Sequence, residues 1–283
     1  MKKIKMEEIT GGEARELYAE NPVILLPLGS YEDQGVHAPM GDFIYAERIS
    51  ELVAQKASDK GVRTVVAPVL PFGGNDFFGS MPGGIALSPE TFSAVLRDML
   101  SCLIRHGLTR IIVMNGHSGN VHPIQTVTQE VYRRDAVMVP SLYLWQMAHR
   151  LLPKILGPEK ARMSAGHGAD PLTSIALDLF PDLVRKDLVP SPMSAPHVLG
   201  LPVSGFATIG YEGIDISVPV ECDELAPNGI FGGDARLSSP ETGSALVQHL
   251  TDISTSFVLH FASQSEGNST NRRANERPST VRR

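Results

Sequence analysis

Short apolar runs alternate, along the first half of the chain, with longer segments whose apolar residues recur every three or four positions. Each run is nearly continuous in Val, Ile, Leu and Met, which is typical of a strand buried on both faces of a parallel sheet. The predicted strands occupy residues 23–29, 64–70, 110–114 and 136–142.

The segments between these runs predict helices. The clearest one begins at Ser88-Pro89-Glu90, a capping serine followed by proline and an acid, and ends at Gly107. Further helices are expected at residues 45–57 and 123–134, after a first helix within residues 1–20. This alternation predicts a single α/β domain with a mostly parallel β-sheet flanked by helices.

The second half of the chain has weaker patterns. We expect a helix at residues 171–180, a strand at 213–218 and a last helix that begins at Ser239-Pro240-Glu241. From residue 262 the sequence consists mainly of Ser, Asn, Arg and Glu, a composition that favours disorder. We therefore predict one folded domain, residues 1–261, and a disordered polar tail, residues 262–283.

Charge and composition limit the classes of partner. The net charge is −6 and the pI about 5.8, whereas nucleic-acid and membrane-surface binders present a basic face. No apolar run approaches the roughly 20 residues that span a bilayer. The N-terminal lysines are not followed by the apolar stretch of an export signal. With only Cys102 and Cys222, which form no disulfide framework, the cytoplasm is the expected location.

A loop rich in metal-ligand residue types follows the first predicted strand. Residues 29–42 contain three acids, a glutamine and a histidine: Glu32, Asp33, Gln34, His37 and Asp42. Carboxylates and imidazoles bind zinc, manganese and iron. A polar turn would use similar residues, but ligands of parallel sheets bind beyond the carboxyl ends of the strands. This position favours a metal site.

Two further segments carry histidines that could belong to the same site. Residues 115–120, Asn-Gly-His-Ser-Gly-Asn, follow the third strand and place His117 at the same sheet edge. Residues 166–174 contain His167 and Asp170, which could assist in general acid–base catalysis. The alternative for Asp170 is that it caps the helix that follows.

Taken together, these segments resemble the creatininase (creatinine amidohydrolase) family, of which the chain would be a divergent member. Gly29-Ser30-Tyr31-Glu32 is similar to the start of the family's first motif, with Asp42 after it. Residues 115–120 are similar to its Asn-Gly-His-x-x-Asn motif, and residues 166–174 to a His-Ala-Gly-Glu-like stretch that ends in Glu-Thr-Ser. The resemblance covers nearly all of residues 20–260.

The resemblance implies a parallel α/β fold, a homo-oligomer such as a hexamer, and a centre of one or two divalent metal ions. Glu32, Asp42 and His117 match the family's metal ligands, and His167 matches a catalytic histidine. Zn²⁺ is the metal expected first, with Mn²⁺ or Fe²⁺ as alternatives. Family members mostly cleave C–N bonds of cyclic amides or formamides.

Two positions depart from the family's pattern. Gln34 stands where the family has a histidine ligand, and Gly119 stands where creatininase itself has a glutamate. Both family residues bind the second ion, so the resemblance implies a single ion here unless His37 or Asp33 takes part.

We therefore predict a metal-dependent amidohydrolase that cleaves a small cyclic amide, lactam or formamide through metal-activated water. His167 would donate a proton to the leaving nitrogen or stabilise the oxyanion. Gln34, His37 and Asp170 would act as a weak ligand, an orienting side chain and a partner of His167, respectively. The candidates for an apolar pocket wall are Tyr31, Phe77, Phe78 and Trp145.

Two other functions fit the same residues. The first is a catalytically inactive binding or scaffold protein, which the altered ligand positions would allow. The second is a metal-dependent lyase or isomerase that acts on a small polar metabolite. A folded chain without metal affinity would favour the scaffold, and bound metal without amide hydrolysis would favour the lyase.

Overall fold

A four-stranded parallel sheet forms the centre of the computed structural model, which describes residues 3–193 and 196–271, with side chains up to residue 264. The strand order is β2-β1-β3-β4. The strands are β1 (Val23–Leu28), β2 (Thr64–Val66), β3 (Ile111–Asn115) and β4 (Ser141–Tyr143). Leu28 pairs with Asn115, so β1 and β3 end side by side at one edge.

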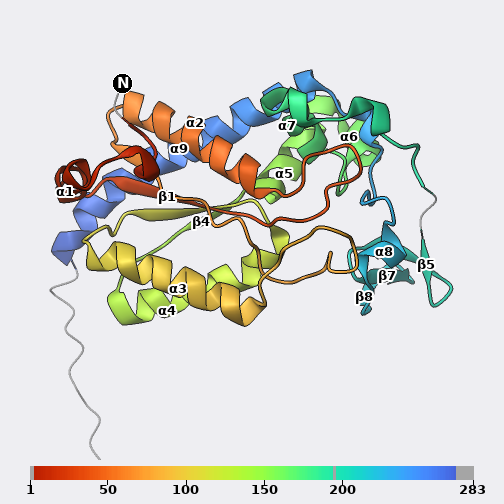
Figure 1. Ribbon diagram of the computed structural model, residues 1–283, viewed down its shortest axis with the longest axis horizontal. Coiled ribbons are helices and arrows are strands. Elements are labelled where there is room, and N and C mark those ends of the chain that lie inside the picture. The colour runs from red at the N-terminus through yellow and green to blue at the C-terminus, as the bar shows by residue number, and fades with distance from the viewer. Residues whose placement is uncertain (1–2, 194–195, 272–283) are drawn as a thin grey trace, which may run out of the picture.

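Helices cover both faces of this sheet: α2, α5, α7 and α9 lie on one face, α3 and α4 on the other (Figure 1). The helices are α1 (Gly11–Ala19), α2 (Phe43–Asp59), α3 (Pro89–Arg105), α4 (Val121–Asp135), α5 (Leu144–Leu156), α6 (Pro158–Ser164), α7 (Leu172–Leu179), α8 (Cys222–Leu225) and α9 (Pro240–Asn271). Short 3₁₀ turns lie at Met6–Glu8, Ser118–Asn120, Pro181–Leu183, Lys186–Leu188 and Ala235–Leu237. The predicted α/β fold is confirmed. Within the described residues, no helix has the length and apolar character needed to cross a membrane.

The side chains of β1 divide between two hydrophobic cores. Val23 and Leu25 pack in the core that includes α2, α5, α7 and α9, while Ile24 and Leu26 pack in the core that includes α3 and α4. Every residue of β1 is buried. This burial on both faces explains why the strand is a continuous apolar run in the sequence rather than an alternating one.

A second, antiparallel sheet lies beyond one end of the parallel sheet, next to α8 (Figure 1). Its strands are β5 (His197–Val198), β6 (Leu201–Gly205), β7 (Thr208–Tyr211) and β8 (Ile214–Ser217), in that order. β8 confirms the strand predicted at residues 213–218. The other three strands are short and include Pro202 and Gly205, which weaken a strand pattern, and the sequence analysis did not predict them.

Three predicted boundaries need correction. The strand predicted at 136–142 begins only at Ser141, because Ala136 has a φ of 55° and ends α4 in the left-handed conformation. β2 ends at Val66, ahead of Pro68, which has no N–H to donate to a ladder. The last helix continues to Asn271, so residues 262–271 are helical where a disordered tail was predicted. The rest of that tail, 272–283, lies outside the described residues.

Gly29 is a position where the fold leaves no room for a side chain. A Cβ added there would lie 2.3 Å from Phe43 Cα, at the start of α2. We expect Gly29→Ala to lower the free energy of unfolding by about 1–3 kcal/mol, because strand and helix must move apart. Urea unfolding measures the change. Gly12→Ala is the control, since the nearest atom to its Cβ is Thr10 Oγ1 at 3.8 Å. Equal midpoints for the two variants would contradict the close approach.

Candidate metal centre

Three predicted ligands come together where β1 and β3 end. Glu32 lies in the loop after β1, Asp42 directly precedes α2, and His117 follows β3. Because these strands are neighbours and end in register, the side chains that follow them reach the same point. Glu32, Asp42 and His117 are 6%, 2% and 4% exposed, so the group is almost fully removed from solvent.

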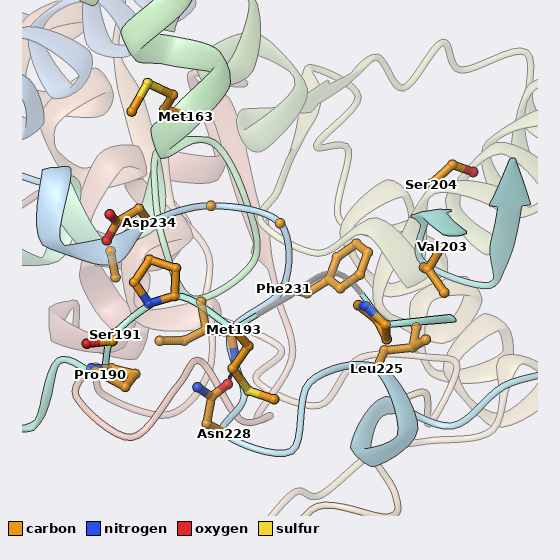
Figure 2. A pocket seen from close by; sticks show the side chains of 16 residues that line it. Met163, Pro190, Ser191, Met193, Val203, Ser204, Leu225, Asn228, Phe231 and Asp234 are labelled. Carbon is orange, nitrogen blue, oxygen red and sulfur yellow. Dashed lines mark hydrogen bonds between the residues drawn. The ribbon is translucent and has the colours of Figure 1, made fainter. Parts of the chain in front are cut away.

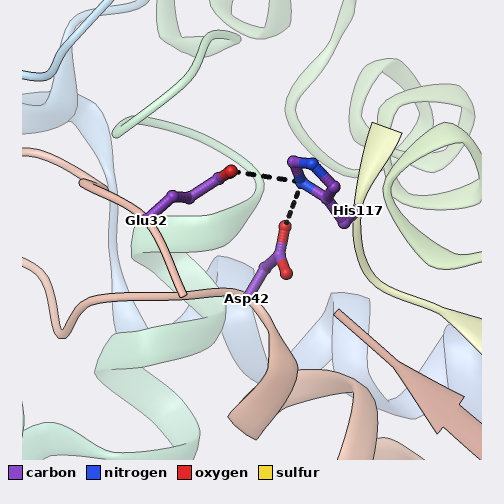
Figure 3. A group of neighbouring side chains, drawn as sticks. All are labelled: Glu32, Asp42 and His117. Carbon is purple, nitrogen blue, oxygen red and sulfur yellow. Dashed lines mark hydrogen bonds and ion pairs between the residues drawn. The ribbon is translucent and has the colours of Figure 1, made fainter. Parts of the chain in front are cut away.

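His117 Nδ1 is the common point of contact in this group (Figure 3). It lies 3.3 Å from Glu32 Oε2 and 3.2 Å from Asp42 Oδ2. One ligand atom from each residue falls within 4.8 Å of the other two. Two carboxylates and an imidazole converging at this spacing form a set of three oxygen and nitrogen donors that fits a divalent ion such as zinc.

Hydrogen bonds from nearby residues orient the two carboxylate side chains. The Ser30 backbone N–H donates to Asp42 Oδ1 at 2.6 Å, which leaves Oδ2 facing His117. Gln34 Nε2 donates to Glu32 Oε1 at 3.0 Å. Gln34 therefore orients a predicted ligand.

The motif at residues 115–120 holds the histidine and the loops around it. The Asn115 side chain accepts from His117 N at 3.1 Å and donates to His117 O at 2.7 Å. Asn120 accepts from Gly74 N and donates to Gly29 O, which ties the glycine-rich loop to the end of β1. These contacts set the position of the backbone from which the imidazole projects.

The electrostatics of the group favour a bound cation. Burial raises the pKa of Asp42 to about 7, although the nearby His117 opposes the shift. Burial acts in the same direction on Glu32, but the charge of His117 and its hydrogen bond lower the pKa of Glu32 overall. Burial alone would lower the pKa of His117, yet the two carboxylates raise it well above its usual value. The carboxylates thus stabilise positive charge at this point, which a divalent ion would supply.

Gly119 has no side chain and therefore supplies no ligand for a second ion. A Cβ at this residue would lie 2.6 Å from His117 Nε2 and 2.4 Å from Gly74 O. No side chain fits there without displacing the histidine or the backbone of the glycine-rich loop. The structure of the described residues therefore supports the prediction of a single-ion group formed by Glu32, Asp42 and His117.

His167 lies in the same cavity with a fixed ring orientation. Its Nε2 donates to the Asp33 backbone carbonyl at 2.7 Å, which identifies Nε2 as the nitrogen that carries the proton in the neutral ring. The Phe78 ring stacks on the imidazole with centroids 4.5 Å apart, and Phe206 packs edge-on at 5.5 Å. Burial lowers the pKa of His167, and the nearby charge of Glu32 offsets only part of this shift.

A cavity of about 200 Å³ joins the three-residue group to His167. The residues that line it are Glu32, Gln34, Asp42, His117, Ser118, Tyr143, Trp145, His149, Gly166, His167, Gly168, Pro171, Leu172 and Phe206. Trp145, a predicted wall residue, is confirmed. Phe78 stacks on His167, Phe77 packs against Phe78 and Phe206, and Tyr31 packs against Phe43.

Two predicted roles are wrong. His37 does not join the ligand group: its Nε2 lies 3.0 Å from Thr173 Oγ1, and it packs beside α7. Asp170 neither caps α7 nor partners His167, because its Oδ1 accepts from the hydroxyls of Ser174 and Ser238. It is fully buried and connects α7 to the segment before α9.

Three side chains that line the cavity were not predicted from the sequence: Tyr143, His149 and Phe206. Tyr143 ends β4, and His149 lies one helical turn after Trp145 on α5, the helix that follows β4. The place of β4 beside β3 in the sheet could therefore have indicated both residues. Phe206 lies in the turn between β6 and β7, in a sheet that was not predicted. No sequence signal connected it to the site.

Comparison with known proteins agrees with this geometry. The profile of the creatininase family, described as creatinine amidohydrolase, matches residues 7–258. The chain belongs to the creatininase family. It is 28% identical to a creatinine amidohydrolase of Pseudomonas putida, over 62% of this chain and 71% of the relative. It is 27% identical to a mycofactocin precursor peptide peptidase of Mycolicibacterium smegmatis, over 65% and 68%.

Solved structures of creatininase share the fold of this family member. A creatinine amidohydrolase (creatininase) structure superposes with a TM-score of 0.75 at 24% identity, covering 92% of this chain and 99% of the other. Structures described as a Zn-Zn type mutant creatininase and as creatininase Mn give TM-scores of 0.73 and 0.71 at the same identity and coverage. The relatives' names describe hydrolases, but one is a peptidase, so family membership alone does not select non-peptide C–N bonds.

Metal content tests the three-residue group directly. We expect protein purified without chelator to hold about one zinc or manganese ion per chain, because three ligands suffice for one ion. Glu32→Gln should lose most of that metal, since the amide cannot supply a carboxylate oxygen. Plasma mass spectrometry with circular dichroism measures metal and fold together.

Asp33→Asn is the matched control for this variant. Asp33 is in the same loop but outside the group, and its Oδ1 accepts from Gly35 N, a contact that an amide oxygen can keep. Its metal content should equal that of the wild type. Equal metal loss in both variants, or full retention in Glu32→Gln, would contradict the assignment.

Proposed function

We propose that the chain is a metal-dependent amidohydrolase that cleaves a C–N bond of a small molecule bound in the 200 Å³ cavity. The observation that carries this proposal is the buried group of Glu32, Asp42 and His117 that faces the same cavity as His167. Three protein ligands leave a coordination position free for reactants, as catalytic zinc sites do and structural ones do not. The zinc and manganese forms of creatininase support Zn²⁺ first and Mn²⁺ second, and Fe²⁺ is the third candidate for these donors.

Each residue of the cavity has a task in this proposal. A divalent ion bound by Glu32, Asp42 and His117 would polarise the scissile carbonyl and activate water for attack on it. Gln34 holds Glu32 in place through its amide N–H. Because the group is almost fully buried, the field of these charges acts on the substrate with little screening by water.

His167 is suited to carry the proton. Its Nε2–H is engaged by the Asp33 carbonyl, so Nδ1 has the free lone pair in the neutral ring. A lowered pKa keeps the ring neutral near pH 7. We propose that Nδ1 accepts a proton from the attacking water and passes it to the nitrogen that leaves, which completes one hydrolysis with no net change in His167.

The size of the cavity supports a small substrate. A lactam, cyclic urea or formamide fits a volume of about 200 Å³ between Trp145, Leu172 and the ligand group. A peptide bond is the competing class, because one relative is named as a peptide peptidase. The homo-oligomer and the cytoplasmic location stay predictions from the sequence.

Hydrolysis by the zinc-loaded protein tests the function. We expect turnover of at least one member of a panel of creatinine, 2-pyrrolidone, dihydrouracil, N-formylglycine and glycylleucine, read by chromatography of the products. Glu32→Gln should lower kcat/KM at least ~10³-fold, because the metal supplies several kcal/mol of transition-state stabilisation.

The control is Asp33→Asn, which keeps the backbone carbonyl that accepts from His167 and should therefore keep kcat/KM within about tenfold, far less than the loss expected of Glu32→Gln. Activity that survives in metal-free Glu32→Gln would exclude metal catalysis. Stoichiometric metal with no turnover of any amide would instead favour the lyase or isomerase.

The pH profile tests His167. A neutral ring is the active form, and its folded pKa is lowered, so kcat/KM should be constant near pH 7 and should fall only when the pH drops below the ordinary histidine value of about 6.5. His167→Gln should lower kcat ~10²- to 10⁴-fold and remove this acidic limb. Metal content measured at each pH shows whether the fall in kcat/KM at low pH comes from protonation of His167 or from loss of the metal ion. If kcat/KM of His167→Gln still falls at low pH while the metal content stays constant, the fall is caused by another group.

A further inference from the structure

One aromatic ring reaches the metal cavity from the antiparallel sheet. The metal cavity is the space of about 200 Å³ that joins Glu32, Asp42 and His117 to His167. Among the described residues of the antiparallel sheet and its turns, Phe206 alone lines this cavity. Phe206 is 40% exposed, so its ring stands at the boundary between the cavity and solvent.

The turn that carries Phe206 is held by contacts on both sides. Gly205 pairs with Thr208, so Phe206 and Ala207 form a two-residue turn, in which Ala207 has a φ of 54°. A Cβ added at Gly205 would lie 2.8 Å from Thr208 Oγ1, so the two strands approach closely there. The Val218 N–H donates to Ala207 O at 2.9 Å. These contacts fix the backbone from which the ring projects.

Four other aromatic rings contact the Phe206 ring. The distances between ring centroids are 5.1 Å to Phe77, 6.1 Å to Phe78, 5.5 Å to His167 and 4.9 Å to Phe231. Aromatic pairs attract each other at such separations. Phe231 in turn lines a separate cavity of about 360 Å³ (Figure 2), and Phe206 is not among the residues that line it. The four contacts therefore hold the Phe206 ring at the wall of the metal cavity.

The place of Phe206 beside His167 relates it to one end of the scissile bond. In the proposed function, His167 passes a proton to the leaving nitrogen, so this nitrogen lies within hydrogen-bond reach of the imidazole. Phe206 packs edge-on against the same imidazole. A large group on the leaving nitrogen would therefore meet the Phe206 ring.

We propose that Phe206 limits the size of the group that the leaving nitrogen of the substrate carries. This inference rests on the proposed function, which places the leaving nitrogen beside His167. The substrate class is then a primary amide, an N-methyl amide or a small lactam, whose nitrogen carries hydrogen, a methyl group or part of a small ring. An N-benzyl amide would overlap with the Phe206 ring.

Binding of two hydroxamates to the zinc-loaded protein tests this limit without requiring turnover. N-methylacetohydroxamate and N-benzylacetohydroxamate offer zinc the same two oxygens and differ only in the group on nitrogen. Trp145 is the chain's single tryptophan and lines the metal cavity, so its fluorescence reports occupancy. The N-methyl compound should bind more tightly by about tenfold or more, because the benzyl group would have to displace the Phe206 ring. Equal affinities, or tighter binding of the N-benzyl compound, would overturn the role of Phe206.

Removal of the ring gives the second arm of the test. Phe206→Ala should bring the two affinities within about twofold of each other, and Phe206→Leu should give an intermediate ratio. Tyr211→Ala is the matched control, since Tyr211 lies on β7 of the same sheet, is 50% exposed and lines neither cavity. It should keep the wild-type ratio. A wild-type ratio in Phe206→Ala would overturn the proposal, and Phe206→Leu decides in the same way if the alanine variant does not fold.

Failure of the proposed function gives a different result. If the zinc-loaded protein does not bind N-methylacetohydroxamate, its ion has no open coordination position, which would overturn the proposed function and this inference together. Selective binding without hydrolysis of any amide would keep the size limit set by Phe206 and reject the amidohydrolase.

Discussion

Two buried carboxylates that face one imidazole are the interaction on which the rest of the site depends. Burial removes the water that would solvate the carboxylate of Asp42, and the charge of Glu32 adds to the effect, so the pKa of Asp42 rises to about 7. Positive charge at His117 Nδ1, supplied by a proton or replaced by a metal ion, offsets this cost together with the hydrogen bonds from Ser30 and Gln34. The surrounding chain must therefore hold three groups in positions that they would not keep by themselves.

The parallel sheet provides that restraint. The register of β1 with β3 fixes where the loops that carry the three ligands begin, and backbone N–H groups and amide side chains set the final orientation. Glycines complete the arrangement on the other side of the ring, since a Cβ at Gly73 would lie 2.8 Å from His117 Cδ2. Close backbone packing on that side directs Nδ1 toward the carboxylates, and the same packing excludes a further ligand at Gly119.

The residues of the candidate metal centre could be predicted in part because they follow regular strands. Apolar runs located β1 and β3, and the edge at which such strands end is where ligands collect, so the loop 29–42 and His117 were placed at the site. The resemblance to the creatininase family then selected Glu32 and Asp42 within that loop. His37 and Asp170 were assigned wrongly because a polar residue close to a site in sequence can point away from it. His37 turns to Thr173, and Asp170 binds two serine hydroxyls. Which way a loop side chain points depends on tertiary contacts that sequence spacing does not contain.

In the antiparallel sheet, too, tertiary contacts rather than a sequence pattern bring a residue to the site. Its strands are two to five residues long, and Phe206 reaches the metal cavity only because the turn between β6 and β7 packs against His167 and Phe231. Short strands have little periodicity, so β8 was the one strand of this sheet to be predicted, and the Phe206 ring has no sequence signature. The regular half of the fold thus positions Glu32, Asp42 and His117, while the irregular half contributes Phe206 to the wall of the same cavity.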